Sequence, residues 1–300
     1  MGDRRSSKEA EVRPADTAKP ARLAPGLYLV ATPIGNLRDI TLRALDVLRA
    51  ASLVLCEDTR VTRKLFERHQ LDTKLLAYHD HNAESVRPRV LKELDEGAAI
   101  ALVSDAGTPL VSDPGYKLVA AAIEAGHKIF PVPGASAALA ALVAAGLPTD
   151  RFFFEGFLPP KSGARKSRLV ELQKIPATLV FYESGPRLAE SLHDMSATLG
   201  AREAAVCREL TKAFEEIRRG TLAMLAAHYT ETGAPKGEIV VIVSPPGEEA
   251  VIDDAALDAK IESALKKLSL KDAAAAIAAE TGLPRKGIYA RALALAEKKK

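Results

Sequence analysis

Residues 101–116 read ALVSDAGTPLVSDPGY and join an apolar run to a loop of small or conformationally restricted residues. The run AIALVS at 99–104 is typical of a buried strand, and residues 116–125 have the composition of a helix. A strand followed by a loop and a helix is one unit of an α/β fold. The loop from Ser104 to Gly115 therefore lies at the carboxyl end of a strand, where open α/β sheets bind ligands.

The same alternation extends in both directions from this loop. Further strand-like runs lie at 27–32, 52–58, 74–79 and 128–132, and helical patterns separate them at 40–50, 62–70 and 86–96. This order predicts a mostly parallel sheet covered by helices. We assign it to a first α/β domain at 25–134.

A second α/β domain is expected at 135–246. After a helix at 135–146, strands are predicted near 151–157, 177–183, 205–210, 215–222 and 237–243, and helices near 187–199 and 222–229. Several of these strands follow one another without a helix, so an antiparallel or mixed sheet is expected.

The two ends of the chain differ from this core. Residues 1–24 mix charge, proline and alanine without a period, which is typical of a disordered arm. The sequence SPPGEEAVID at 244–253 indicates a linker. Three helices are expected in a C-terminal unit at 250–300, which resembles a helix-turn-helix with its turn at 281–284. A helical packing or dimerisation module would have the same pattern.

Composition excludes several classes of protein. Hydrophobic residues make up 47% and charged residues 27%, with a net charge of +3, as in ordinary globular chains. No apolar run reaches the roughly 18 residues of a membrane span, and no secretory signal is evident, so a cytoplasmic location is expected. Cys56 and Cys207 lack a C-x-x-C spacing and are predicted to be plain strand residues.

The usual nucleotide-binding signatures are missing, since neither G-x-x-x-x-G-K-[ST] nor a G-x-G-x-x-G after the first strand occurs. Instead, three loops of small residues follow predicted parallel strands: TPIGNLRDIT at 32–41, SDAGTPLVSDPG at 104–115 and PVPGAS at 131–136. Gly107 and Gly115 can take φ > 0, and the last loop leads into a helix N-terminus. These loops should meet at one cleft for a small polar ligand, whose identity the spacing leaves open.

At these motifs the chain resembles a known family. TPIGNLRDIT, CEDTR, HDHN, ALVSDAGTPLVSDPGY, PVPGASAALAALVAAGLPTDRFFFEGFLPPK, FYES, RELTKAFEE and KGEIVVIV are together similar to the ribosomal-RNA small-subunit 2′-O-ribose methyltransferases of the tetrapyrrole-methylase superfamily. The resemblance implies two α/β domains with S-adenosylmethionine in the cleft between them, usually a homodimer, and 2′-O-methylation of a cytidine in 16S ribosomal RNA. Porphyrinogen methylases usually have a G-x-G-D-P-x-L-[LI]-T-type first loop, so TPIGNLRDIT favours the RNA branch.

The resemblance also implies the cofactor-binding residues. They belong to the three loops and to two segments of the second domain: Pro33, Ser104, Asp105, Ala106, Gly107, Thr108, Gly134, Ala135, Ser136, Tyr182 and Leu210.

Methyl transfer from a sulfonium is an in-line displacement in which the protein mainly aligns donor and acceptor. A base that accepts the proton of the ribose hydroxyl would add about 10²–10⁴-fold. Our ranking of candidates is Asp58 and Glu57, then His79 and His81, then Glu183. The alternative for Asp58 is a helix N-cap. Two histidines without a third ligand are weak evidence for a metal, and none is expected.

Basic residues are candidates for contacts with RNA phosphate. They occur after the second strand, at the start of the second domain and near the last helix: Arg60, Arg63, Lys64, Lys161, Arg165, Arg285 and Lys286. A solvated surface would give the same pattern.

Two other functions remain open. A tetrapyrrole methyltransferase would use the same fold and cleft for a macrocycle. A non-catalytic RNA-binding assembly protein would retain the cleft without transferring a methyl group.

Overall fold

The structure is a computed structural model, which describes residues 22–113, 115–247, 254–281 and 285–297. Three predictions fall wholly or partly outside the described residues: most of the N-terminal arm, the second half of the linker and the turn at 282–284.

The first sheet has five parallel strands in the order β3-β2-β4-β1-β5, as the alternation predicts. Its strands are β1 (Gly26–Val30), β2 (Leu53–Cys56), β3 (Leu75–Ala77), β4 (Ala99–Val103) and β5 (Ile129–Val132). Its helices are α1 (Leu42–Ala50), α2 (Thr59–His69), α3 (Ala83–Asp95) and α4 (Tyr116–Glu124), with a short 3₁₀ turn, η1 (Leu37–Asp39).

Helices cover both faces of this sheet, which is why its strands are apolar throughout. Val47 of α1 and Phe66 of α2 pack with Val30 on one face. Leu94 of α3 and Leu118 of α4 pack on the other face. All five strands run in the same direction, so their carboxyl ends and the loops that follow them share one edge.

The second sheet is mixed, in the order β6-β7-β10-β8-β9, with β6 parallel to β7 and the other pairs antiparallel. Its strands are β6 (Phe152–Phe157), β7 (Thr178–Ser184), β8 (Glu203–Arg208), β9 (Glu216–Thr221) and β10 (Glu238–Val243). Its helices are α5 (Ala137–Ala145), α6 (Ser162–Leu172), α7 (Gly185–Leu199) and α8 (Leu222–Thr232). The expectation of a mixed sheet is confirmed.

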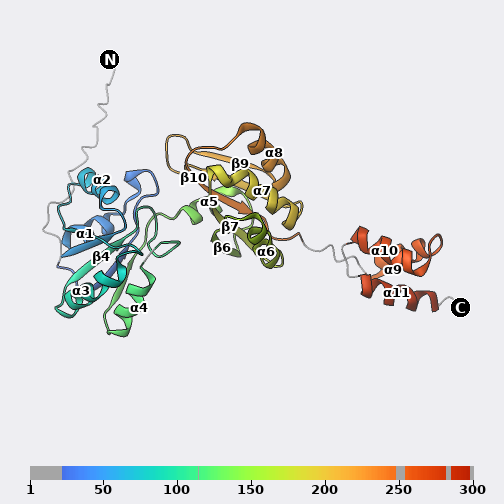
Figure 1. The fold of residues 1–300 in the computed structure, drawn as a ribbon, viewed down its shortest axis with the longest axis horizontal. Coiled ribbons are helices and arrows are strands. Elements are labelled where there is room, and N and C mark those ends of the chain that lie inside the picture. Colours follow the sequence, from blue (N-terminus) through green and yellow to red (C-terminus); the bar gives the residue numbers. More distant parts are fainter. Residues whose placement is uncertain (1–21, 114, 248–253, 282–284, 298–300) are drawn as a thin grey trace, which may run out of the picture.

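The two faces of the second sheet are covered unequally. Small residues of α5, such as Ala141 and Ala145, pack on the face that carries Val180 and Cys207. Helices α6, α7 and α8 cover the opposite face around Phe181. In Figure 1 these elements form a second layered unit after the one made by β1 to α4.

One helix was not predicted. The sequence indicates only a basic cluster at 161–168, but these residues belong to α6, which is anchored by Leu169 and Leu172. The two apolar anchors lie at the end of the segment, so its beginning has only the pattern of a charged surface.

In the part of residues 248–300 that the structure describes, three helices follow the second sheet, as predicted: α9 (Asp254–Leu265), α10 (Leu270–Thr281) and α11 (Arg285–Glu297). They share a core of their own that includes Ile261, Ile277 and Ile288 (Figure 1). Among the described residues, no helix is both long and apolar enough to cross a membrane.

Candidate active site

A cavity of about 340 Å³ lies where the loops after β1, β4 and β5 meet the second sheet. The first unit and the start of α5 contribute Ile34, Ala106, Gly107, Thr108, Val111, Ser112, Asp113, Ser136 and Ala137. The second sheet and its loops contribute Phe157, Tyr182, Glu183, Ser184, Cys207, Leu210, Gly237, Glu238, Ile239 and Val240. The three loops of small residues therefore meet at one cleft, as their positions predict.

Hydrogen bonds between the three loops hold together the side of the cavity that the first sheet contributes. The Thr32 hydroxyl donates to the Ser104 carbonyl at 3.0 Å, and Thr32 also forms a backbone bridge with Gly107. The Thr108 hydroxyl donates to the Ala135 carbonyl at 3.1 Å. Gly107 has φ +85°, and a Cβ there would lie 3.3 Å from the Ile34 side chain. The positive φ therefore favours glycine, and a Cβ would in addition crowd Ile34.

The loop after β1 also contacts the second unit directly. The Asn36 amide donates to the Thr211 hydroxyl at 3.1 Å. A Cβ at Gly35 would lie 2.4 Å from Cγ of Lys212, so the lysine stem occupies the space that a side chain would need. Lys212 is itself fixed by ion pairs to Glu209 and Glu238 at 2.7 and 3.0 Å. These contacts tie the two units together beside the cavity.

The wall from the second sheet is aromatic. The Tyr182 ring meets Phe154 and Phe157 edge-on, with centroid distances of 5.0 and 5.6 Å. Burial raises the pKa of the Tyr182 hydroxyl, so this ring stays neutral and acts as an apolar surface with one polar end.

The residues predicted for the cofactor fall into two groups. One group lines the cavity: Ala106, Gly107, Thr108, Ser136, Tyr182 and Leu210. The other group is not among the lining residues: Pro33, Ser104, Asp105, Gly134 and Ala135. Ser104 Oγ binds the backbone of Ala106, and the side chain of Asp105 accepts the Asp58 amide at 3.1 Å. Ser136 is the N-cap of α5, as the helix after PVPGAS requires.

Sequence reasoning gave no role to several lining residues. Phe157 and the run Gly237–Val240 belong to blocks that carried the resemblance, but nothing in their local pattern indicates a ligand. They reach the cavity because β6 ends beside it and β10 begins beside it. This placement follows from the order of the strands in the sheet and not from the local sequence pattern.

Asp58 is the N-cap of α2, the alternative considered for CEDTR. Its carboxylate accepts from the Arg60 amide at 2.8 Å and pairs with the Arg60 guanidinium. The hydrogen bonds from Arg60 lower the pKa of Asp58 to about 2. A carboxylate with so low a pKa is a weak base at neutral pH.

Neighbouring carboxyls are shifted the other way. Partial desolvation, with the charges of Asp105, Asp113 and Asp80, raises the pKa of Glu57. Burial likewise raises the pKa of Asp105 and of Asp113, and each also faces a neighbouring carboxylate. Glu57, Asp105 and Asp113 form an acidic rim, in which desolvation first and mutual repulsion second favour the protonated carboxyl.

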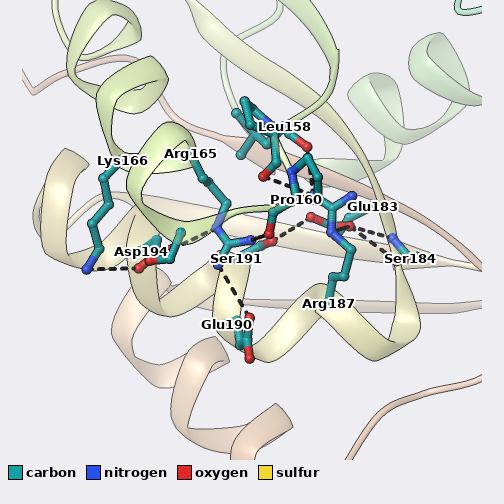
Figure 2. A network of polar contacts seen from close by, with 12 residues as sticks. Leu158, Pro160, Arg165, Lys166, Glu183, Ser184, Arg187, Glu190, Ser191 and Asp194 are labelled. Atoms are coloured by element: carbon teal, nitrogen blue, oxygen red, sulfur yellow. Dashed lines mark hydrogen bonds and ion pairs between the residues drawn. The ribbon is translucent and has the colours of Figure 1, made fainter.

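Glu183 belongs to the lining residues, but its carboxylate is engaged by other groups, which disfavours it as the base. Side chains alternate along β7, so Tyr182 faces the cavity and the Glu183 carboxylate points to α7. That carboxylate accepts from the Ser184 amide at 2.8 Å and from the Ser191 hydroxyl, and it pairs with Arg187 at 3.4 Å (Figure 2). Glu183 is 3% exposed, and both of its carboxylate oxygens already have hydrogen-bond or ion-pair partners.

His79 and His81 follow β3 and are not among the lining residues; their rings lie 5.9 Å apart. In the described part of the chain, no cluster of three or more metal-ligating side chains occurs.

The basic candidates are also divided by the structure. Arg60, Arg63 and Lys64 lie exposed on α2, and Lys161 lies exposed before α6. Arg285 is exposed at the start of α11, where its guanidinium is 3.4 Å from the Lys271 carbonyl; the Lys286 side chain lies outside the described residues. The prediction for Arg165 is wrong, because this side chain is 1% exposed and pairs with Asp194 at 2.7 Å (Figure 2).

Comparison with known proteins identifies this arrangement. Residues 26–226 match the family model of Tetrapyrrole (Corrin/Porphyrin) Methylases, and residues 251–296 match that of the RsmI C-terminal HTH domain. Among solved structures, cobalt precorrin-4 methyltransferase has a TM-score of 0.56 at 19% identity over 73% of this chain and 94% of its own. Diphthine synthase has a TM-score of 0.56 at 17% identity, over 73% and 89%. The fold is thus that of the tetrapyrrole methylases.

Relatives of higher sequence identity define the family within the tetrapyrrole methylases. Ribosomal RNA small subunit methyltransferase I of Mesorhizobium japonicum is 54% identical over 93% of this chain and 95% of its own length. The protein of that name from Vibrio cholerae is 48% identical, over 89% and 93%. The chain belongs to the ribosomal RNA small subunit methyltransferase I family.

Proposed function

We propose that this chain transfers the methyl group of S-adenosylmethionine to the 2′-oxygen of a cytidine in 16S ribosomal RNA. The observation that carries the proposal is the cavity at the carboxyl ends of β1 and β4, in a chain 54% identical to a ribosomal RNA small subunit methyltransferase I. The C-terminal match over residues 251–296 favours RNA over a tetrapyrrole macrocycle.

The cavity suits the donor chemically. Backbone and small side chains at 106–108 leave room for close approach by a polar ligand, and the α5 N-terminus, capped by Ser136, lies at the same place. Tyr182 and Phe157 offer apolar surface on the opposite wall. A structural neighbour, uroporphyrin-III C-methyltransferase of Thermus thermophilus (TM-score 0.52, 20% identity, over 72% of this chain and 96% of its own), was solved with S-adenosylhomocysteine, consistent with this use of the fold.

The ribose oxygen attacks the methyl carbon as the carbon–sulfur bond breaks, so the donor leaves as S-adenosylhomocysteine. A base must take the hydroxyl proton. We place Glu57 ahead of Asp58 for this role, because the pKa of Glu57 is raised whereas Arg60 holds Asp58 at about 2. His79 stays a third candidate.

Exposed basic side chains beside the acidic rim are suited to contact RNA phosphate. Arg60, Arg63 and Lys64 follow Glu57 and Asp58 on α2, so phosphate bound there would bring a ribose toward the acidic rim. Lys161 and Arg285 are proposed as further phosphate contacts.

Two further proposals follow from the family. A homodimer would cover exposed apolar side chains of α5, where Leu139 is 50% and Val143 75% exposed, and light scattering would measure it. We also propose a cytoplasmic location, because a ribosomal substrate would be met there.

Nucleoside mass spectrometry tests the function. 16S RNA or small subunits from cells that lack the protein are incubated with it and the donor. A new 2′-O-methylcytidine is expected, and Gly107→Val serves as the inactive control. Methylation of a base, transfer to a porphyrinogen instead, or no transfer by folded protein would contradict the proposal.

A further inference from the structure

The loop at 158–161 connects the cavity wall to α6, and its backbone carbonyls need hydrogen-bond donors from other elements. It reads LPPK; it follows Phe157, the last residue of β6, and it ends at Lys161, the N-cap of α6. Pro159 and Pro160 have no N–H and cannot take part in a strand ladder as donors. The carbonyls of residues 158–160 lie beyond the last paired residue of β6, Phe157, so their donors must come from outside the strand ladder.

Two arginines supply these donors. Arg187 Nη2 donates to the Leu158 carbonyl at 2.7 Å and lies 3.4 Å from that of Pro159. Arg165 Nη1 donates to the Pro160 carbonyl at 3.2 Å. Three consecutive carbonyls are thus held by two guanidinium groups, from α7 and α6 (Figure 2).

Each arginine is anchored on its other side by a buried carboxylate. Glu183 lies 3.4 Å from Arg187, and Asp194 lies 2.7 Å from Arg165. Both carboxylates belong to residues only 3% exposed. Although burial opposes ionisation of Asp194, hydrogen bonds from Arg165, Ser162 and Lys166 lower its pKa, so the carboxylate stays charged.

Stability alone is a poor explanation for these pairs. A buried pair such as Arg165–Asp194 adds little net stability compared with apolar side chains of the same volume. The pair of Glu183 with Arg187, whose side chain is 28% exposed, is partly screened by solvent. What an apolar pair would not provide is a set of donors aimed at the loop carbonyls. The arrangement is better explained by the position that it gives to the loop.

That position determines where Phe157 lies. Phe157 lines the cavity and meets Tyr182 edge-on, yet it is 56% exposed. Tyr182 precedes Glu183 on β7, so one strand presents a ring to the cavity and, on its other face, the carboxylate that anchors Arg187. An apolar ring this exposed at the mouth of a cavity is covered when a ligand packs against it.

We propose that Arg187 is a positioning residue for the methyl donor: it holds the loop at 158–161 by its carbonyls and so fixes Phe157 as the wall against which the donor packs. Arg165 supports the same loop from α6. The inference rests on the proposed function, because it requires that the donor occupy this cavity.

A double-mutant cycle on donor affinity tests the coupling. Phe157→Ala and Arg187→Gln are made singly and together in the full chain, and the Kd for S-adenosylmethionine is measured by calorimetry. Loss of the aromatic contact should weaken binding about tenfold. Arg187→Gln should weaken it nearly as much, and the double variant no more than the worse single one.

Arg168→Gln is the matched control. Arg168 also lies on α6 and pairs with Glu155 at 2.7 Å, but none of its hydrogen bonds reaches the loop at 158–161. The Arg168→Gln variant should leave the affinity for S-adenosylmethionine unchanged. Arg187→Lys, which keeps the charge but loses the planar donor pair, gives an intermediate Kd and is used if the glutamine variant does not fold.

A purely structural role would lower the unfolding temperature without this coupling. The inference is overturned if the Kd changes are additive, or if the Arg187 variants bind the donor as tightly as the parent. These outcomes differ from failure of the proposed function, in which the parent protein itself would bind no donor.

Discussion

The two walls of the cavity are built on different physical principles. The wall from the first sheet includes backbone and small side chains at 106–108, where Gly107 has a positive φ that favours glycine. The wall from the second sheet includes the rings of Phe157 and Tyr182, and buried carboxylates on the far side of the strands pair with arginines. The first wall therefore depends on local conformation, and the second on tertiary contacts. Substitutions in the two should have different consequences.

The largest expected effect concerns the acidic rim beside the first wall. Glu57→Gln should lower kcat by about 10²–10⁴-fold if Glu57 accepts the ribose proton. Because its pKa is raised, the parent rate should increase as pH rises through that value, and the variant should lack this acid limb. Single-turnover methylation against pH measures both.

Asp58→Asn is the control for Glu57, since asparagine retains a capping oxygen for α2. Its rate should stay near that of the parent. Equal rates for the parent and the Glu57 variant would remove Glu57 as the base.

Behind the second wall, Asp194→Ala should lower the free energy of unfolding by about 3–5 kcal/mol, because it leaves the Arg165 charge buried without its closest partner. Glu171→Ala removes an exposed partner of Arg168 and should cost less than about 1 kcal/mol. Denaturant titration measures both, and similar losses would contradict the contrast between buried and exposed pairs.

The Asp194 pair should also depend on pH. Its pKa is lowered in the folded state, so its stabilisation is complete above the unfolded value of about 3.9 and is lost as pH falls through the folded value. The stability difference between the parent and Asp194→Asn should shrink on acidification below about pH 4. A constant difference would argue against an ionised carboxylate.

Within the first wall, Gly107→Val should weaken donor binding by at least about tenfold, since a branched side chain at positive φ is strained and enters the cavity. Gly97→Val is a matched control: its φ is also +85°, but a Cβ there meets nothing within 4 Å. Both variants should lose stability, and only the first should lose donor affinity. Loss of affinity in both would point to a general folding defect.

The smallest expected effect is on RNA. Lys64→Gln should weaken RNA binding several-fold and reduce the slope of log K against log salt by about one, the value for a single phosphate that the side chain no longer neutralises. Lys117→Gln, on α4 at the opposite face of the first sheet, should change neither quantity. Filter binding at several salt concentrations distinguishes them.

The difference between local conformation and tertiary contacts also explains which features the sequence could predict. The parallel sheet and its three loops follow from local pattern, because apolar runs and glycine-marked turns act over a few residues. The roles of Arg165 and Glu183 could not be predicted, because a charged side chain has the same local pattern whether it is exposed or buried beside a partner 29 residues away, as Arg165 is beside Asp194. Resemblance identified the blocks around Phe157 and Gly237, but only sheet order showed that they line the cavity.

A crystal structure with S-adenosylhomocysteine tests the central claim most directly. We expect density for the ligand between the backbone at 106–108 and the ring of Tyr182, with Phe157 covered by the ligand. Density at another surface of the folded protein, with this cavity empty, would contradict the account.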